Sequence, residues 1–312
     1  MSAVGFVPCL PPGLHPGMDA LALGLAQVLE DGGFDLRLFP ADLRGGAAAI
    51  ASGQTAAVDA ALAAGMQAIV LFVLDAREPA SAVARSLARG IPVVAIHKPA
   101  YPVSASVVIP NYYQGVVLAH ALARALLPLA HRAPRVAILG GPEILDDVEL
   151  VRGAVAGVRD CGLELVNDPF LECYRNLDDV RGGGKRAAAR LLDEFHPFDG
   201  WVVFNDETAL DALELLEERG LGGVVPTVSR NGSPFIVREL ERGKTHATFD
   251  YQLPEIGMLA GQSVIQLLNG IEAPADALVT GPIGALITAA NVAAYVPWQR
   301  RVREAKLVIG GT

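Results

Sequence analysis

The strongest constraint on the fold is a local pattern that repeats along the chain: a short apolar run, a turn, then an amphipathic segment. The apolar runs are rich in Val and Ile and lack polar alternation, which predicts strands buried on both faces. Such strands form parallel sheets that are covered by helices and joined by right-handed crossovers. The predicted strands cover residues 4–7, 35–39, 68–72, 93–96, 107–109, 136–139, 164–166, 201–204 and 224–228.

The segments between these runs predict helices, and several of them are followed by a glycine that suits a left-handed helix cap. The pattern runs once over residues 1–105 and begins again at Asn111, and the stretch 96–115 between them holds three prolines. A chain of 312 residues suits about two domains. The predicted fold class is therefore α/β, with two doubly wound parallel-sheet lobes. The predicted helices cover residues 18–30, 54–64, 80–88, 147–161, 181–194 and 207–219.

Composition excludes several classes of protein. Hydrophobic residues make up 52% of the chain, which is too many for a disordered protein. The net charge of −9 argues against nucleic-acid binding by this chain alone, because phosphate contacts need clustered Lys and Arg. The most apolar stretch, 115–130, contains His120, Arg124 and Pro128 and is too short to cross a bilayer.

No motif of catalysis, metal binding or cofactor binding is found. The first strand leads into Pro11-Pro12-Gly13 instead of a G-x-G-x-x-G fingerprint, and no G-x-S-x-G or H-E-x-x-H occurs. The chain has three cysteines, an odd number, and no C-x-x-C motif, so no disulfide framework is predicted. Cys161 and Cys173 could form a disulfide, or all three cysteines could be small buried apolar residues. We expect no enzyme, no cofactor, no metal and no catalytic residue.

The buried strand 201–204 ends in Asn205 and Asp206, and a helix pattern follows at once. Ligands of parallel α/β sheets bind at the carboxyl ends of strands. One of the two residues can cap the helix. Because a cap needs only one polar residue, the pair is either a cap alone or a cap with a ligand-binding neighbour.

Several segments together resemble the periplasmic binding protein-like class I family. This family includes the ribose-type solute-binding proteins of sugar ABC transporters and the effector domains of LacI-type repressors. The matching segments, in family order, are GIPVVAIHK at 90–98, 111–115, ELVRGAVAGVRDCG at 149–162, the Asn-Asp strand end at 205–206, VPTVSRNGSP at 225–234, RELERGKTHATFDYQLPEIG at 238–257 and ALITAANVAAY at 285–295.

The resemblance implies two lobes that close on a ligand. The N-terminal lobe is expected to comprise residues 1–108 plus 251–282, and the C-terminal lobe residues 109–250 plus 283–312. The chain is expected to cross between them three times, near 107–111, 248–252 and 280–285.

The resemblance also implies a set of ligand-binding residues. Asn205, Arg152 and Gln252 match a pocket Asn, Arg and Gln of the family. The sequence departs from its sugar binders elsewhere: it has His97 and Lys98 instead of Asp-Arg, and Arg230 and Asn231 where an Asp is common. The first loop carries His15 and no aromatic residue. Tyr112, beside the first crossing, either stacks on the ligand or packs in the hinge.

The departures change the charge expected at the site. Loss of two carboxylates leaves Lys98, Arg152 and Arg230 as cations that favour an anionic ligand, such as a sugar acid. Alternatively, Lys98 and Arg230 point to solvent or pair with local carboxylates, and His97 is a neutral hydrogen-bonding residue.

The resulting hypothesis is a monomeric solute-binding protein. It would bind a small carbohydrate or a derivative, neutral or acidic, and deliver it to a membrane ABC permease. The abrupt start at the first strand indicates a periplasmic chain that has lost its leader. The alternative is the effector domain of a cytoplasmic LacI-type regulator, which needs a DNA-binding headpiece before residue 1.

Overall fold

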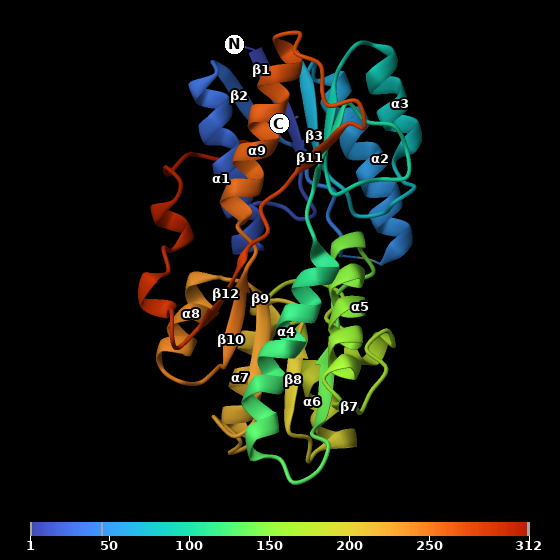
Figure 1. The fold of residues 1–312 in the computed structure, drawn as a ribbon. Helices are drawn as coiled ribbons and strands as arrows, with labels where there is room; N and C mark the ends of the chain where they lie inside the picture. The colour runs from blue at the N-terminus through green and yellow to red at the C-terminus, as the bar shows by residue number, and fades with distance from the viewer. Residues whose placement is uncertain (1, 45, 311–312) are drawn as a thin grey trace. The chain divides into compact units, whose positions relative to one another are not determined.

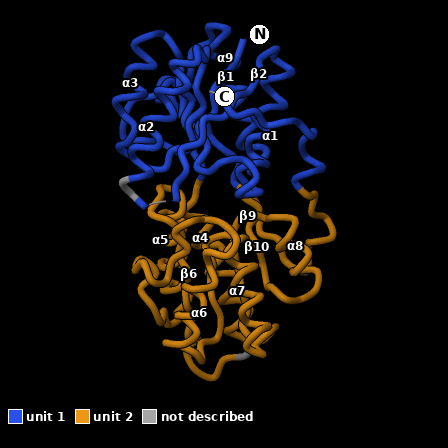
Figure 2. Tube along the Cα trace, turned by 180° about the vertical axis from the view of Figure 1, so that it is seen from behind, with its two compact units in different colours: residues 1–109, 252–283, 298–312 blue, residues 110–251, 284–297 orange. Residues whose placement is uncertain are grey.

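The computed structural model describes residues 2–44 and 46–310, which divide into two compact α/β units. Unit 1 comprises residues 1–109, 252–283 and 298–312, and unit 2 comprises residues 110–251 and 284–297 (Figure 2). Among the described residues, no helix is long and apolar enough to span a bilayer.

Unit 1 is built on a six-stranded sheet in the order β11-β5-β4-β3-β1-β2, and every neighbouring pair is parallel (Figure 1). The helix pair α1 and α9 packs together, and α2 packs against α3. The elements are β1 Ser2–Val7, α1 Pro16–Asp31, β2 Phe34–Leu38, α2 Ala47–Ala63, β3 Ala68–Phe72, α3 Ala80–Ala88, β4 Val93–Ile96, β5 Ala105–Val108, α9 Leu253–Leu268 and β11 Leu278–Thr280.

Unit 2 repeats this topology in the order β12-β10-β9-β8-β6-β7, with β12 antiparallel to β10 and the other pairs parallel. The helix pairs are α4 with α5 and α6 with α7. The elements are α4 Asn111–Leu126, β6 Arg135–Leu139, α5 Leu145–Asp160, β7 Glu164–Leu165, α6 Gly184–Phe195, β8 Gly200–Val203, α7 Asp206–Glu218, β9 Thr227–Asn231, α8 Pro234–Glu241, β10 Ala247–Asp250 and β12 Ala285–Thr288.

Each sheet has one point where the direction of strand succession reverses. It lies between β1 and β3 in unit 1 and between β6 and β8 in unit 2, because the chain goes first to an edge strand and then back. Right-handed crossovers then place the helices of the two directions on opposite faces of the sheet. In doubly wound sheets the crevice for ligands opens at this point, beyond the carboxyl ends of the strands.

The central strands β6 and β8 of unit 2 are buried on both faces, as their apolar sequences predict. Successive residues of one strand enter different cores: Trp201 and Val203 pack under α6 and α7, whereas Val202 packs under α4 and α5. Trp201 is fully buried and donates from Nε1 to Thr227 Oγ1 at 2.7 Å.

Glycines allow one helix pair in each unit to touch backbone to backbone. A Cβ added to Gly153 of α5 would lie 1.9 Å from the carbonyl oxygen of Tyr112 in α4. In unit 1, a Cβ on Gly257 of α9 would lie 2.0 Å from the carbonyl oxygen of Leu21 in α1. No larger residue fits at either contact without separating the helices.

The chain passes between units inside the three predicted crossing ranges, but it also passes a fourth time, between 297 and 298. The prediction that all of 283–312 belongs to the C-terminal lobe is therefore wrong for the last segment, which rejoins unit 1. Leu38 of β2 donates its N–H to Val308 and accepts from Gly310, at 2.8 and 2.7 Å. Trp298, the first residue of this segment, is buried.

The three cysteines are free. Only Cys9 is buried, whereas Cys161 is partly exposed and Cys173 is exposed. The prediction of three buried cysteines is therefore wrong for two of them, because Cys161 ends α5 and Cys173 lies in a surface 3-10 turn.

Candidate functional site

The polar residues that follow β6, β8, β9 and β10 gather at one edge of the unit 2 sheet, which we call the carboxyl edge of unit 2. It contains the point of strand reversal between β6 and β8. Its side chains are buried although they are charged or strongly polar. They are Asn111, Asp146, Asp147, Asp179, Asn205, Asp206, Glu207, Arg230, Asn231 and Asp250.

Asn205 both caps a helix and contacts a second group. Its Oδ1 accepts from the N–H of Thr208, at 3.0 Å, and so caps α7. Its Nδ2 donates to Asp179 Oδ1 at 2.5 Å. The cap thus uses only the carbonyl half of the side chain, and the amide half lies among the buried carboxylates.

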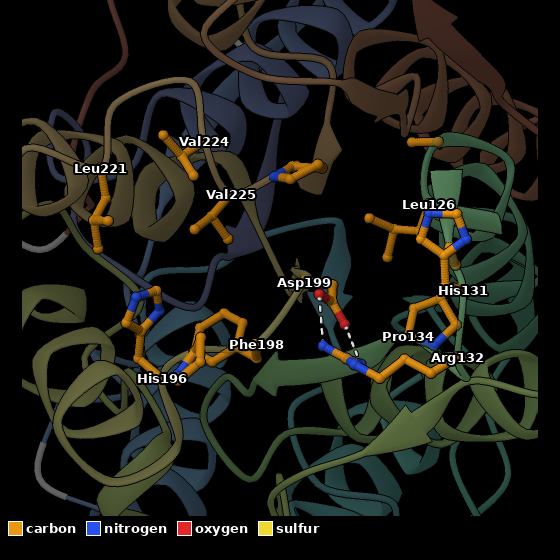
Figure 3. Close-up of a pocket in the computed structure, with 14 residues that line it drawn as sticks. Leu126, His131, Arg132, Pro134, His196, Phe198, Asp199, Leu221, Val224 and Val225 are labelled. Carbon is orange, nitrogen blue, oxygen red and sulfur yellow. Dashed lines mark hydrogen bonds and ion pairs between the residues drawn. The ribbon is translucent and has the colours of Figure 1, made fainter. Parts of the chain in front are cut away.

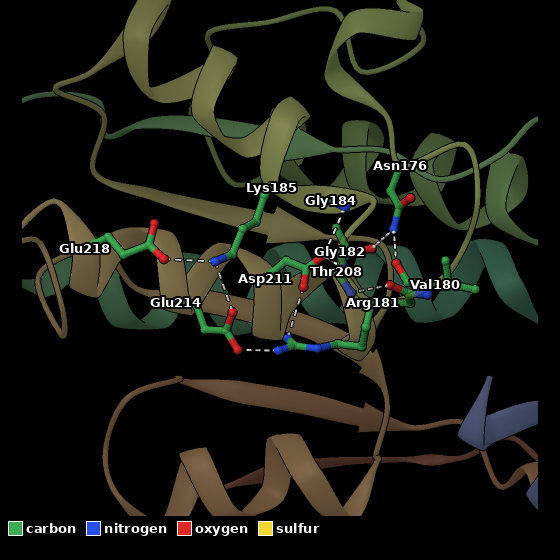
Figure 4. Close-up of polar contacts among 11 residues, drawn as sticks. Asn176, Val180, Arg181, Gly182, Gly184, Lys185, Thr208, Asp211, Glu214 and Glu218 are labelled. Carbon is green, nitrogen blue, oxygen red and sulfur yellow. Dashed lines mark hydrogen bonds and ion pairs between the residues drawn. The ribbon is translucent and has the colours of Figure 1, made fainter. Parts of the chain in front are cut away.

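The loop that carries Asp179 is tied to α7 by charged contacts (Figure 4). The N–H groups of Gly182 and Gly184 donate to Asp211 Oδ2 at 2.7 and 3.0 Å. Arg181 forms ion pairs with Asp211 and Glu214 of the same helix. This anchoring holds Asp179 at the carboxyl edge with a left-handed backbone, at φ 53°.

Asp206, the neighbour of Asn205, has a structural role. Its Oδ1 accepts from the hydroxyls of Ser229 and Thr248 at 2.5 and 2.8 Å, and its Oδ2 accepts from the N–H of Ser233 at 2.6 Å. These bonds join β8 to β9, β10 and the start of α8. Next to it, Glu207 accepts from Asn231 Nδ2 at 3.0 Å.

Arg230 lies buried between two carboxylates and an aromatic ring. Its Nη2 is 2.5 Å from Asp147 Oδ1 and 3.3 Å from Asp146 Oδ2, and its guanidinium carbon stands 4.5 Å from the centre of the Tyr251 ring. Tyr251 in turn donates from its hydroxyl to Asn111 Oδ1 at 2.8 Å. Residues from α4, α5, β9 and the end of β10 therefore form one polar network.

Burial sets the protonation of this network. It raises the pKa of Asp147 well above the usual value, and the charge of Asp146 adds to the rise while Arg230 opposes it. Burial, followed by the charge of Glu207, raises the pKa of Asp179 in the same way. Burial alone lowers the pKa of Arg230, but the charges of Asp147, Tyr251 and Asp146 outweigh it, so the guanidinium stays charged.

The charge balance of this edge is acidic, which agrees with the alternative that Arg230 pairs with local carboxylates and Lys98 points to solvent. Arg230 is the only Lys or Arg among the buried residues that the structure describes, and two aspartates neutralise it. Lys98 and Arg152 are exposed. The hypothesis of an anionic ligand has therefore lost its main support, because it rested on these three cations.

In unit 1, the predicted residues lie after β1 and β4. His15 caps α1, since its Nδ1 accepts from the N–H of Met18 at 3.2 Å. His97 is buried, and its ring meets Phe72 edge-on at 5.1 Å. Gln252, the first residue of unit 1 after the second crossing, precedes α9 and is partly buried.

Tyr112 of unit 2 is 51% exposed, so it does not pack inside the unit. Its role in ligand stacking stays a prediction, as do the ligand roles of His15, His97, Lys98, Arg152, Asn205, Arg230, Asn231 and Gln252.

Backbone strain coincides with several of these predicted positions. His97, Asn231 and Gln252 have positive φ angles of 73°, 125° and 59°, and each stands at or just after the end of a strand. Residues other than glycine rarely adopt positive φ angles, and residues with such strained backbone cluster at functional sites. The strain supports their assignment to a site independently of the family resemblance.

A hollow lies at the opposite, amino edge of the unit 2 sheet (Figure 3). It has a volume of about 600 Å³ and mostly apolar walls, among them Leu126, Phe198 and Val225. The charged groups at its rim, Arg132 and Asp199, neutralise each other at 2.8 Å. It offers few polar groups to orient a solute, so the carboxyl edge is the better candidate.

Several residues of the carboxyl edge were not among the predicted ligand-binding residues, including Asp146, Asp147, Asp179 and Glu207. Asp147 and Glu207 were assigned to predicted helices without a role at the site, and no role was predicted for Asp146 or Asp179. Asp146 and Asp147 start the helix that follows β6, just as Asn205 and Asp206 follow β8. The rule that polar residues after buried strands face the ligand crevice could have found both pairs.

Comparison with known proteins agrees with this fold. The chain has the fold of an ABC transporter periplasmic solute-binding protein from Actinobacillus succinogenes 130z with bound D-allose, at a TM-score of 0.81, 17% identity, and coverage of 95% of this chain and 100% of the other. A solute-binding protein from Mycobacterium smegmatis with bound glycerol gives a TM-score of 0.81 at 21% identity, covering 97% and 99%. One from Bacillus halodurans C-125 with bound myo-inositol gives 0.76 at 19%, covering 94% and 96%.

The fold and the buried polar edge thus define a binding protein of the two-lobed α/β class. The sequence model of the periplasmic binding protein domain matches residues 9–272. The chain therefore belongs to that family, and the predicted family, fold class and role as a binding protein instead of an enzyme are confirmed at this level. A search of curated proteins gives no significant match.

Proposed function

We propose that the chain captures a small neutral polyhydroxyl solute, a sugar or a polyol, for an ABC permease. The observation that carries the proposal is the carboxyl edge of unit 2, where buried carboxylates outnumber the one buried guanidinium. Carboxylates accept hydrogen bonds from hydroxyl groups and repel anions, and bonds to a charged acceptor are the stronger ones. The fold neighbours crystallised with D-allose, glycerol and myo-inositol support the same class of ligand.

Delivery to a permease and a periplasmic location are part of this proposal, supported by membership of the periplasmic binding protein domain family. We expect the chain to act as a monomer, which light scattering with and without solute would test. Cell fractionation of the source organism would test the location.

Thermal melting with matched neutral and charged solutes tests the proposal. The panel pairs D-glucose with D-glucuronate and D-glucosamine, and adds D-allose, L-arabinose, myo-inositol and glycerol. A solute at 100 times its dissociation constant adds about 2.7 kcal/mol to the free energy of unfolding. For a unit of this size, the midpoint should rise by about 5–10 °C.

We expect one or more neutral compounds to raise the midpoint and their acidic counterparts to have no effect. Asn231→Ala should abolish the rise, whereas the exposed Asn269→Ala, as a matched control, should keep it. Stabilisation by a sugar acid only, or by no compound of the panel, would refute the proposal.

A further inference from the structure

Three charged side chains at the carboxyl edge have hydrogen-bonding atoms that no protein group satisfies. Arg230, Asp146 and Asp147 are each at least 97% buried. After their mutual ion pairs are made, Arg230 Nε and Nη1, Asp146 Oδ1 and Asp147 Oδ2 remain without a partner among the described residues. Native proteins leave few buried polar atoms in this state, so four in one cluster require an explanation.

The cluster is held in a fixed geometry at the place where a solute is expected. Asp146 and Asp147 stand in the first turn of α5, which follows β6 at the strand reversal, and Arg230 stands near the end of β9. The Tyr251 ring lies against the guanidinium at 4.5 Å, and the Tyr251 hydroxyl is fixed by Asn111. The guanidinium therefore cannot swing away to find other acceptors without breaking these contacts.

The unsatisfied atoms form a balanced set of two donors and two acceptors. On the guanidinium, Nε carries one hydrogen and Nη1 carries two, and the aspartates offer two acceptor oxygens. An anion would satisfy the guanidinium but would have no hydrogen to donate to the two aspartate oxygens. An ammonium group would satisfy the aspartates and leave the guanidinium N–H groups unpaired.

A hydroxyl group can do both, because it donates one hydrogen and accepts another. Two neighbouring hydroxyls can donate one hydrogen to each of the two aspartate oxygens, and their oxygens, with two lone pairs each, can accept from the N–H groups of Nε and Nη1. We propose that Arg230, Asp146 and Asp147 form a subsite for a vicinal pair of hydroxyl groups on the solute. The inference rests on the proposed function and names the part of the solute that this edge recognises.

Four three-carbon probes isolate this chemistry from the identity of the natural solute. Glycerol has vicinal hydroxyls, 1,3-propanediol has the same length without them, serinol is a cationic counterpart and glycerate an anionic one. Titration is followed by the ¹⁵N–¹H signal of the Arg230 side-chain Nε–H, assigned by its loss in Arg230→Gln. This signal reports directly on one of the unsatisfied donors, in the unaltered protein.

We expect glycerol to shift the Arg230 signal in a saturable manner, and the three other probes to bind at least tenfold more weakly. Asp147→Asn and Asp146→Asn should each weaken glycerol binding about tenfold or more and leave 1,3-propanediol within twofold. The control is Asp178→Asn, which removes an exposed carboxylate next to this edge and should change neither.

An Arg230 signal that stays fixed while glycerol shifts other signals would refute the subsite, and would mean that internal water satisfies the four atoms. Equal binding of 1,3-propanediol, or tighter binding of serinol, would also refute it. Each of these results leaves the proposed function intact if neutral sugars still raise the melting midpoint. Absence of binding by every sugar and polyol would refute the proposed function itself. If an aspartate variant fails to fold, the wild-type titration still decides the matter.

Discussion

Replacing Gly153 with alanine tests the backbone contact between α4 and α5. The added Cβ would lie 1.9 Å from the carbonyl oxygen of Tyr112, whereas Cβ contacts under 3.0 Å essentially never occur. The helices must therefore separate by about 1.1 Å at this point, and the neighbouring contact of Gly115 with the Leu150 carbonyl would open with them.

The magnitude follows from two opposing terms. Overpacking a tight contact costs about 1–3 kcal/mol, and more when backbone has to move. Alanine in place of glycine inside a helix returns about 1 kcal/mol. With backbone on one side of the clash, we expect a net loss of about 2 kcal/mol, which lowers the melting midpoint of a unit of this size by about 4–8 °C.

The chain offers a convenient assay, because each unit contains one tryptophan. Trp201 lies in the core of unit 2 and Trp298 is buried in unit 1. In a Trp298→Phe background, fluorescence reports the unfolding of unit 2 alone. The exposed Arg159→Ala on the same helix serves as the control. A Gly153→Ala midpoint within 1 °C of its parent would refute the close-packing argument.

Three further outcomes are expected. Gly257→Ala should destabilise unit 1 by a similar amount, about 2 kcal/mol, because its Cβ would lie 2.0 Å from the Leu21 carbonyl oxygen. Calorimetry measures this loss, and melting transitions that all stay unchanged would contradict the prediction. The raised pKa of Asp179 means that the folded state keeps a proton that the unfolded chain releases, so its contribution to stability is full at low pH and is lost as pH rises through the raised pKa. Asp179→Asn should therefore show a flatter decline of unfolding free energy from about pH 4 upward, by at most about 1.4 kcal/mol per pH unit, and an identical slope in urea titrations would contradict the assignment. The Ser233 hydroxyl caps α8 by accepting from the Ile236 N–H at 3.2 Å. Ser233→Ala removes this cap and should lower the free energy of unfolding by about 1 kcal/mol in the same titrations. An unchanged free energy would show that the cap contributes nothing.

Much of the fold could be predicted because a buried strand of a parallel sheet is a continuous apolar run in the local sequence. Strands such as β3 and β4 are continuous apolar runs, and their predicted bounds match the observed ones. The edge strands β11 and β12 were missed, since each is partly exposed and has only three or four residues. The return of the last segment to unit 1 depends on pairing with Leu38, far away in sequence, which no local pattern reveals.

The candidate site was predictable only in part, for a similar reason. Asn205 was found because it combines a strand end with a helix cap, both of which are local signals. Asp146 and Asp147 resemble ordinary acidic residues of a first helical turn, where such charges favour the helix dipole. Their burial becomes apparent only through Arg230, more than 80 residues later in the chain. The residue types at single positions therefore left two alternatives for Arg230, a spare cation or a partner of local carboxylates, and only the structure shows the pairing.

The discontinuous make-up of unit 1 has a consequence for the order of assembly on the ribosome. The first 109 residues emerge with the face of α1 around Leu21 uncovered, because the helix that packs on it, α9, spans residues 253–268. Unit 2, by contrast, is almost one continuous stretch, 110–251, and lacks only β12 and the few residues around it. The half of the molecule translated second can thus complete its core first, and the half translated first must wait for nearly the whole chain. A nascent chain whose residue 251 has just left the ribosome should accordingly protect unit 2 from protease while unit 1 is still cleaved.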